Sequence, residues 1–173
     1  NPFKLQNDEA KNIGFEIRNR ANFWLGYYNE PRLIYTAPAF RLGPWKASNR
    51  RTVHIAIDIF ADKGTKLFSP LDGEVFAAEY RDNQLDYGGV IILKHTTPSK
   101  DEFFTLYGHL DPIFLNNLKV GDKIEKGQNF CQLGSSDVNG GWAPHVHFQL
   151  ALTTDGMEAD WPGVADPDDL LFW

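Results

Sequence analysis

Five polar side chains in this sequence are of the types that bind metal ions and transfer protons. They are His54, Asp58, His109, His145 and His147. His145 and His147 begin a run through Leu150 in which polar and apolar residues alternate, as in a half-buried β-strand. Both imidazoles would then point to one side and could share a metal ion, or one could bind the ion while the other works beside it. The simpler interpretation is an edge strand with two idle histidines, because histidine is often only partly buried.

A second pattern places His54 and Asp58 on one face of an alternating run over residues 52–60, with the small Ala56 between them. Residues four apart on a strand are separated by about 13 Å of rise, so a flat strand would not bring both to one ion. A bend, a bulge or a twisted strand end is needed. Taken alone, the pair is also typical of a solvated polar face.

Taken together, these residues favour a metal-binding catalytic site over idle polar positions. His109 ends a further expected strand, in Tyr-Gly-His-Leu at 107–110. A catalytic zinc site takes three nitrogen or oxygen ligands and leaves a position for water, and histidine titrates near neutral pH. The five side chains can supply both ligands and proton-transfer groups. The sequence has no Gly-x-Ser-x-Gly elbow, no glycine-rich phosphate loop and no His-Glu-x-x-His.

Bulk composition limits the class of protein. The 173 residues suffice for one domain with extensions, and 42% hydrophobic residues suffice for a core. The net charge of −6 argues against nucleic acid or an anionic membrane surface as a partner. No apolar segment is long enough for membrane insertion. The single Cys131 is expected to be a small buried hydrophobe.

Short strands and turns indicate a mainly β fold, an antiparallel sandwich or barrel. Three regions are predicted: an aromatic-rich N-terminal extension packed on the core (1–50), a β domain (51–151) and an acidic C-terminal tail (152–173). The extension is partly irregular, with a short helix over 7–20 and an arm that covers a sheet edge without chemistry of its own. Trp161, Phe172 and Trp173 are expected to anchor the tail. The expected strands lie within 52–60, 66–68, 74–78, 90–95, 103–110, 120–127, 130–133 and 145–150.

The chain resembles the lysostaphin-type zinc metallopeptidases, whose fold is the antiparallel duplicated hybrid motif. Matching motifs occur in the family's order over about 100 residues. They are His-x-x-x-Asp at 54–58, Pro-Leu-Asp-Gly-Glu-Val at 70–75, Tyr-Gly-Gly-Val-Ile-Ile-Leu-Lys-His at 87–95, Tyr-Gly-His-Leu at 107–110, Val-Gly-Asp-Lys-Ile-Glu-Lys-Gly-Gln at 120–128 and Pro-His-Val-His-Phe at 144–148.

This resemblance implies that His54, Asp58 and His147 ligate Zn²⁺ and that His109 and His145 are catalytic. It implies hydrolysis of an amide bond in a peptide-like substrate, such as one derived from peptidoglycan, and a structural role for His95 at the end of a central strand. The alternative is a non-catalytic or regulatory peptidase-like module of a larger multidomain metabolic protein.

The chain departs from the family pattern at three places. Ala56 replaces a usual glycine, and Gln149 stands where an acidic residue is frequent. The loop at 135–144 is longer and carries Trp142, which we expect to lie beside the site and to bear on substrate preference.

A narrower resemblance rests on 26–32, 139–142 and 160–165. These segments look like one subgroup, in which the peptidase-like domain lies between an aminoglycoside-phosphotransferase-like kinase domain and a class III aminotransferase domain. The subgroup implies a cytoplasmic protein, either free-standing or excised from a longer polypeptide with other domains.

Overall fold

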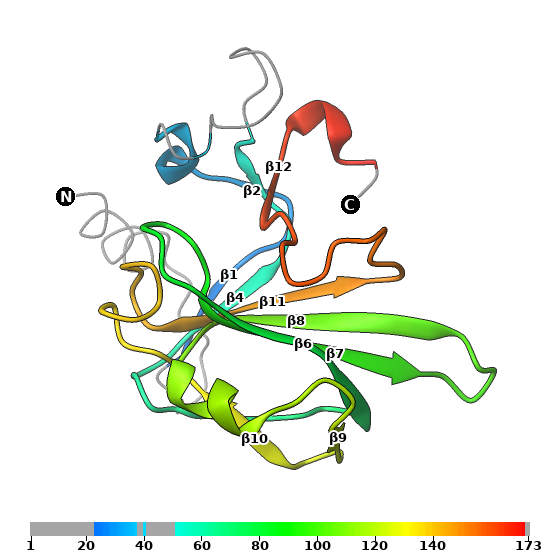
Figure 1. Cartoon of the computed structure of the whole chain (residues 1–173). Helices are drawn as coiled ribbons and strands as arrows, with labels where there is room; N and C mark the ends of the chain where they lie inside the picture. The colour runs from blue at the N-terminus through cyan, green and yellow to red at the C-terminus, as the bar shows by residue number, and fades with distance from the viewer. Residues whose placement is uncertain (1–22, 38–39, 41–50, 172–173) are drawn as a thin grey trace.

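An antiparallel sheet of seven strands carries most of the expected site residues, in the order β1-β4-β11-β8-β7-β6-β9 (Figure 1). The structure is a computed structural model that describes residues 23–37, 40 and 51–171. The helix expected over 7–20 and the anchors Phe172 and Trp173 therefore lie outside the described residues. The strands are β1 (Trp24–Gly26), β4 (Ile57–Phe60), β6 (Gly73–Arg81), β7 (Gly88–Thr96), β8 (Glu102–Leu110), β9 (Lys123–Ile124) and β11 (His145–Ala151).

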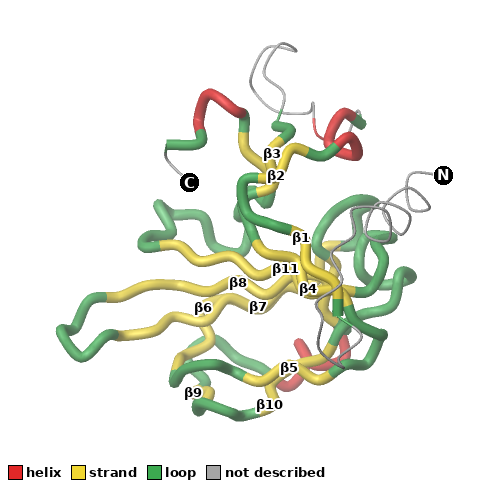
Figure 2. The backbone as a smooth tube through the Cα atoms, turned by 180° about the vertical axis from the view of Figure 1, so that it is seen from behind, coloured by secondary structure: helices red, strands yellow, loops and turns green. Residues whose placement is uncertain are grey.

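Two smaller sheets lie on either side of this one (Figure 2). One pairs β5 (Lys66–Phe68) with β10 (Asn129–Gln132), and the other has the order β12-β3-β2. The three-stranded sheet consists of β2 (Glu30–Pro31), β3 (Val53–His54) and β12 (Val164–Ala165). The short 3-10 helices are η1 (Leu33–Thr36), η3 (Pro112–Asn117) and η4 (Pro167–Asp169). Every strand pairing is antiparallel, which confirms the expected mainly β antiparallel fold.

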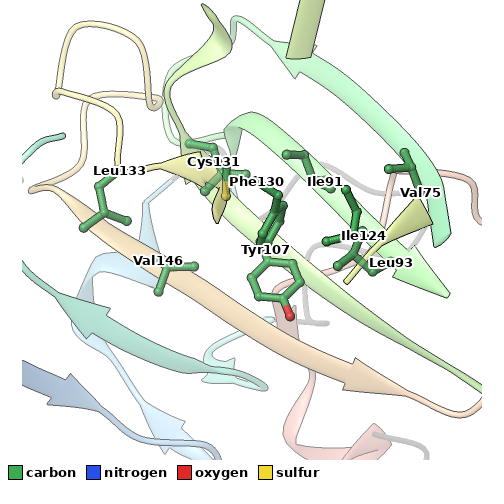
Figure 3. Close-up of a cluster of buried hydrophobic side chains, with 10 residues drawn as sticks. Val75, Ile91, Leu93, Tyr107, Ile124, Phe130, Cys131, Leu133 and Val146 are labelled. Carbon is green, nitrogen blue, oxygen red and sulfur yellow. The ribbon is translucent and has the colours of Figure 1, made fainter. Parts of the chain in front are cut away.

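The central strand β7 is covered on both faces, which explains its nearly continuous apolar run. Ile91 and Leu93 pack into a cluster with β10 (Figure 3). Val90 and Ile92 pack on the opposite face against Trp161 of the C-terminal tail. Trp161 is 3% exposed, so its expected role as an anchor is confirmed. Cys131 is fully buried in the first cluster, as expected.

The run over 52–60 forms two strands rather than the single strand that its alternation suggested. The chain bends at Ile55 and Ala56, so that β3 belongs to the small sheet and β4 to the large one. Ile55 N–H donates to Gly163 O at 3.2 Å, a bond to the C-terminal tail. The bend supplies the departure from a flat strand that a shared ion at His54 and Asp58 requires.

The two flanking regions pair directly with the central region. β1 extends the large sheet beside β4, so residues 24–26 of the arm lie along a sheet edge. β2 and β12 both pair with β3. The boundaries at 50/51 and 151/152 remain predictions. Among the described residues, none of the helices is long and apolar enough to cross a membrane.

We predict that His95 is structural. Its Nδ1 lies 2.7 Å from Asp72 O and its Nε2 lies 2.7 Å from Thr105 Oγ1, at the end of β7 and β8 opposite to His109. His95→Ala removes both hydrogen bonds, one of them to the buried Thr105, and loss of the buried partner costs about 1–3 kcal/mol. Urea denaturation should show this loss of stability while metal content stays that of the wild type. Unchanged stability, or loss of the metal, would contradict the prediction.

Candidate metal centre

A row of four residues crosses the large sheet at the site. The register pairs Gly26 with Asp58, Asp58 with His147, and His147 with Gly108. Directly opposite residues on neighbouring strands hold their side chains within reach of one another. The sheet therefore places Asp58 beside His147, with a glycine on each outer side.

The bend between β3 and β4 adds His54 to this pair. His54 Nε2 lies 3.1 Å from Asp58 Oδ1 and 3.2 Å from His147 Nδ1, and His147 Nδ1 lies 3.2 Å from Asp58 Oδ1. Zinc bonds of about 2.0–2.1 Å in a tetrahedron place ligand atoms about 3.3–3.4 Å apart. The three atoms are thus spaced as one face of a zinc coordination shell, and all three residues are buried.

Hydrogen bonds determine which ring nitrogens face the centre. His54 Nδ1 donates to Tyr27 O at 3.0 Å, and His147 Nε2 donates to Gln149 Oε1 at 3.3 Å. In a neutral imidazole the other nitrogen carries a lone pair. Gln149, the departure from the family pattern, therefore still accepts the proton that an acidic residue would accept.

The resulting arrangement suits a bound cation. Two imidazole lone pairs and Asp58 Oδ1 face one another, and Oδ1 accepts no hydrogen bond from the described part of the chain. Burial alone would raise the pKa of Asp58, but its neighbours His54 and His145 and the guanidinium of Arg32 outweigh burial and hold that pKa well below its usual range. The carboxylate is therefore ionised. Three electron-pair donors in a buried space repel one another unless a positive ion lies between them, so these residues fit a zinc ion.

Two further imidazoles lie beside this centre. His145 Nδ1 donates to Ala143 O at 2.6 Å and His109 Nδ1 donates to Asn139 O at 3.1 Å, so each ring keeps a lone pair on Nε2. The ring centroids are 4.3 Å apart, and His145 Nε2 lies 3.7 Å from Asp58 Oδ1. Burial lowers the pKa of His145 to about 4 and that of His109 well below its usual value. Both rings are neutral at pH 7 and can accept a proton.

A β-bulge turns His109 toward the site. The pairing of β7 with β8 shifts between Gly89 and Ile91, and His109 has φ +63°. Tyr107 and Leu110 both pack in the core cluster, so regular alternation would have directed residue 109 to the core side as well. The extra residue redirects it. Positive φ in a residue other than glycine is strained, and such strain is common at functional sites.

The N-terminal arm also contributes to the site, which the sequence interpretation missed. Arg32 Nη1 donates to Asp58 Oδ2 at 2.5 Å. The Tyr35 ring stacks on His54 with centroids 6.3 Å apart. Edge covering is therefore only part of the arm's role. The one signal for this role in the sequence is that Arg32 lies in a segment on which the expected resemblance to the narrower subgroup rests.

Trp142 lies beside the site as expected. Its ring centroid is 5.8 Å from that of His109 and 6.4 Å from that of His145. It packs in a buried cluster with Tyr35 of the arm and Val164 of the tail. The loop, the arm and the tail therefore meet over the imidazoles.

We predict that Gly163→Ala disturbs the centre. A Cβ there would lie 2.9 Å from His147 Cε1, and a Cβ at Gly73 would lie the same 2.9 Å from Cε1 of the structural His95. Both alanine variants should lose about 1–3 kcal/mol from overpacking. Only Gly163→Ala should also weaken zinc binding, which a chelator competition would measure. Equal zinc affinities in the two variants would contradict this assignment.

Comparisons with solved structures give the fold. The chain is similar to the catalytic domain of the antimicrobial peptidase lysostaphin from Staphylococcus simulans, with 24% identity, a TM-score of 0.50 and coverage of 88% of this chain and 94% of that one. It is also similar to the catalytic domain of the prophage-encoded M23 protein EnpA from Enterococcus faecalis, with 22% identity, a TM-score of 0.54 and coverage of 89% and 95%.

A third match is a zinc-containing peptidase from Vibrio cholerae, at 25% identity and a TM-score of 0.48. It covers 65% of this chain, and this chain spans 30% of that one. No curated protein sequence matches.

The sequence comparison identifies the family. Residues 52–159, more than half of the 173 residues, match peptidase family M23. That range contains all five residues singled out for metal binding and proton transfer. The chain belongs to peptidase family M23.

Proposed function

We propose that this protein is a zinc-dependent peptidase that hydrolyses an amide bond in a peptide-like substrate. One observation carries the proposal. Lone pairs of His54, Asp58 and His147 converge in a buried space that suits a metal cation, and two more neutral imidazoles lie beside it.

In this proposal His54 Nε2, Asp58 Oδ1 and His147 Nδ1 hold the zinc. Three protein ligands leave a position for water, as in catalytic rather than structural zinc sites. When bound, zinc supplies a Lewis acid that lowers the pKa of its water and polarises a carbonyl group. Tyr27 O and Gln149 Oε1 orient the two imidazole ligands through the hydrogen bonds described above.

His109 and His145 would carry the protons. Each has its Nδ1 proton held by a backbone carbonyl, so Nε2 can accept a proton from an attacking water and later donate it to the leaving amine. The protonated ring would also stabilise the negative charge of a tetrahedral intermediate. His109 and His145 are each at most 5% exposed, so bulk water is excluded from them. The low dielectric there strengthens both the proton transfer and the stabilisation of the intermediate.

The finer assignments rest on resemblance. A peptidoglycan-derived peptide is our proposed substrate, and the similarity to the fold of the lysostaphin catalytic domain supports it. The narrower subgroup is supported by one observation: its three segments all reach the site, through Arg32, Trp142 and Gly163. The cytoplasmic location and the kinase-like and aminotransferase domains remain predictions.

We predict one zinc ion per chain and hydrolysis of peptides. His54→Ala should lose both the metal and the activity. His109→Ala and His145→Ala should retain the metal and lower kcat/KM by about 10²–10⁴-fold, the usual contribution of acid–base catalysis. Elemental analysis and an assay on soluble muropeptides and a synthetic peptide library would measure these effects.

Two results would count against the proposal. A purified protein without zinc, whose metal content is unaffected by His54→Ala, would exclude the metal centre. Bound zinc without hydrolysis of any peptide would favour the non-catalytic module instead. No observation on the described residues favours the non-catalytic module. The three proposed ligands are present, and so are the two proposed proton-transfer residues, His109 and His145.

A further inference from the structure

Arg32 is a buried cation in direct contact with one of the proposed zinc ligands. Its side chain is 9% exposed and that of Asp58 is 2% exposed. The guanidinium reaches Asp58 Oδ2 through Nη1 at 2.5 Å and Glu30 Oε2 through Nε at 2.7 Å. The same Nη1 lies 3.3 Å from the Tyr35 hydroxyl. Glu30 is paired in register with His54, so the arm that supplies Arg32 is attached to the strand of another ligand.

The two oxygens of Asp58 therefore have different partners. Oδ2 accepts from Arg32, while Oδ1 faces His54 and His147 and accepts no hydrogen bond from the residues that the structure describes. A guanidinium stays protonated in proteins and its donors have a fixed planar geometry. Oδ2 is thus held away from the centre, and Asp58 can offer a metal one oxygen only.

The charge of Arg32 also bears on the metal. Two neutral imidazoles and one carboxylate would leave about one positive charge on a bound zinc ion, but Arg32 balances the carboxylate from its other side. Glu30 pairs with the same guanidinium, so the group of zinc, Asp58, Arg32 and Glu30 keeps about one positive charge as a whole. Of the two side chains that flank Asp58 there, the cation Arg32 is the one in direct contact with it, so it draws charge from the ligand oxygens and leaves a bound zinc ion better able to polarise water.

The backbone of the arm makes room for this contact. Gly26 is paired with Asp58, and a Cβ at Gly26 would overlap the guanidinium of Arg32. Gly26 does not have a positive φ. Close approach by Arg32 is thus the local reason for a glycine there.

We infer that Arg32 is a positioning residue of the metal centre, which holds Asp58 as a one-oxygen ligand and sets the charge around the ion. The inference rests on the proposed function, because it presumes that zinc binds at these residues. The alternative is that the Arg32–Asp58 salt bridge only holds the arm on the domain. In that case, replacing Arg32 would lower the stability of the protein without changing its affinity for the metal.

The test compares Arg32→Met with Arg81→Met. Arg81 also pairs with two carboxylates, Glu79 and Asp160, and neither of them belongs to the proposed ligand set. Zinc affinity would be measured by chelator competition, and the ligand field by the visible spectrum of the cobalt-substituted protein. We expect zinc affinity to fall about 10–100-fold in Arg32→Met, as for other partners of metal ligands, and to stay unchanged in Arg81→Met.

The cobalt spectrum should also change in Arg32→Met. Once Oδ2 is free, Asp58 can bind through both oxygens, which raises the coordination number and weakens the absorption typical of a tetrahedral site. Arg32→Lys should restore part of the affinity, because lysine keeps the charge but cannot contact Asp58 and Glu30 with one planar fork.

Gly26→Ala keeps Arg32 but displaces its guanidinium, so we expect it to reproduce the loss of zinc affinity. This second variant decides the test if Arg32→Met does not fold. Wild-type affinity and an unchanged cobalt spectrum in these variants would overturn the inference while leaving the proposed function intact. A wild-type protein that binds no zinc would instead overturn the proposed function and the inference with it.

Discussion

The structure depends on the burial of one carboxylate. Asp58 is almost wholly excluded from water, where a charge is costly unless other groups balance it. Arg32 of the N-terminal arm balances one oxygen, and the imidazoles of His54 and His147 surround the other. The arm, the small sheet and the large sheet therefore converge on a single residue. Removing the arm would take Arg32 away and leave this buried charge without part of its balance.

Two departures from regular strand geometry build the site on an otherwise ordinary sheet. The bend at Ile55 and Ala56 brings His54 back over Asp58, and the bulge at His109 turns that ring from the core side to the site. Gly26 and Gly108 stand at the two ends of the row of four residues that includes Asp58 and His147. They leave space there for Arg32 and for Tyr87. The strands place the side chains, and the loop at 135–144 orients two of the rings through Asn139 O and Ala143 O.

Hydrogen bonds decide which ring nitrogen each histidine leaves free. His54, His109 and His145 each direct Nδ1 to a carbonyl oxygen and present Nε2, whereas His147 directs Nε2 to Gln149 and presents Nδ1. His95 has partners at both nitrogens and no free lone pair for a ligand. The five side chains have the same chemistry, and their hydrogen bonds set whether Nε2, Nδ1 or neither nitrogen is free.

The sequence by itself determined the antiparallel β class, the alternation of β11 and the five candidate residues, because period-two patterning and motif spacing are local properties. It also indicated that His54 and Asp58 need a bent strand. It could not show where the bend and the bulge fall, or that Arg32 reaches Asp58 across 26 positions. Only the tertiary structure decided these, because they depend on strand register and on which distant segments share one buried charge.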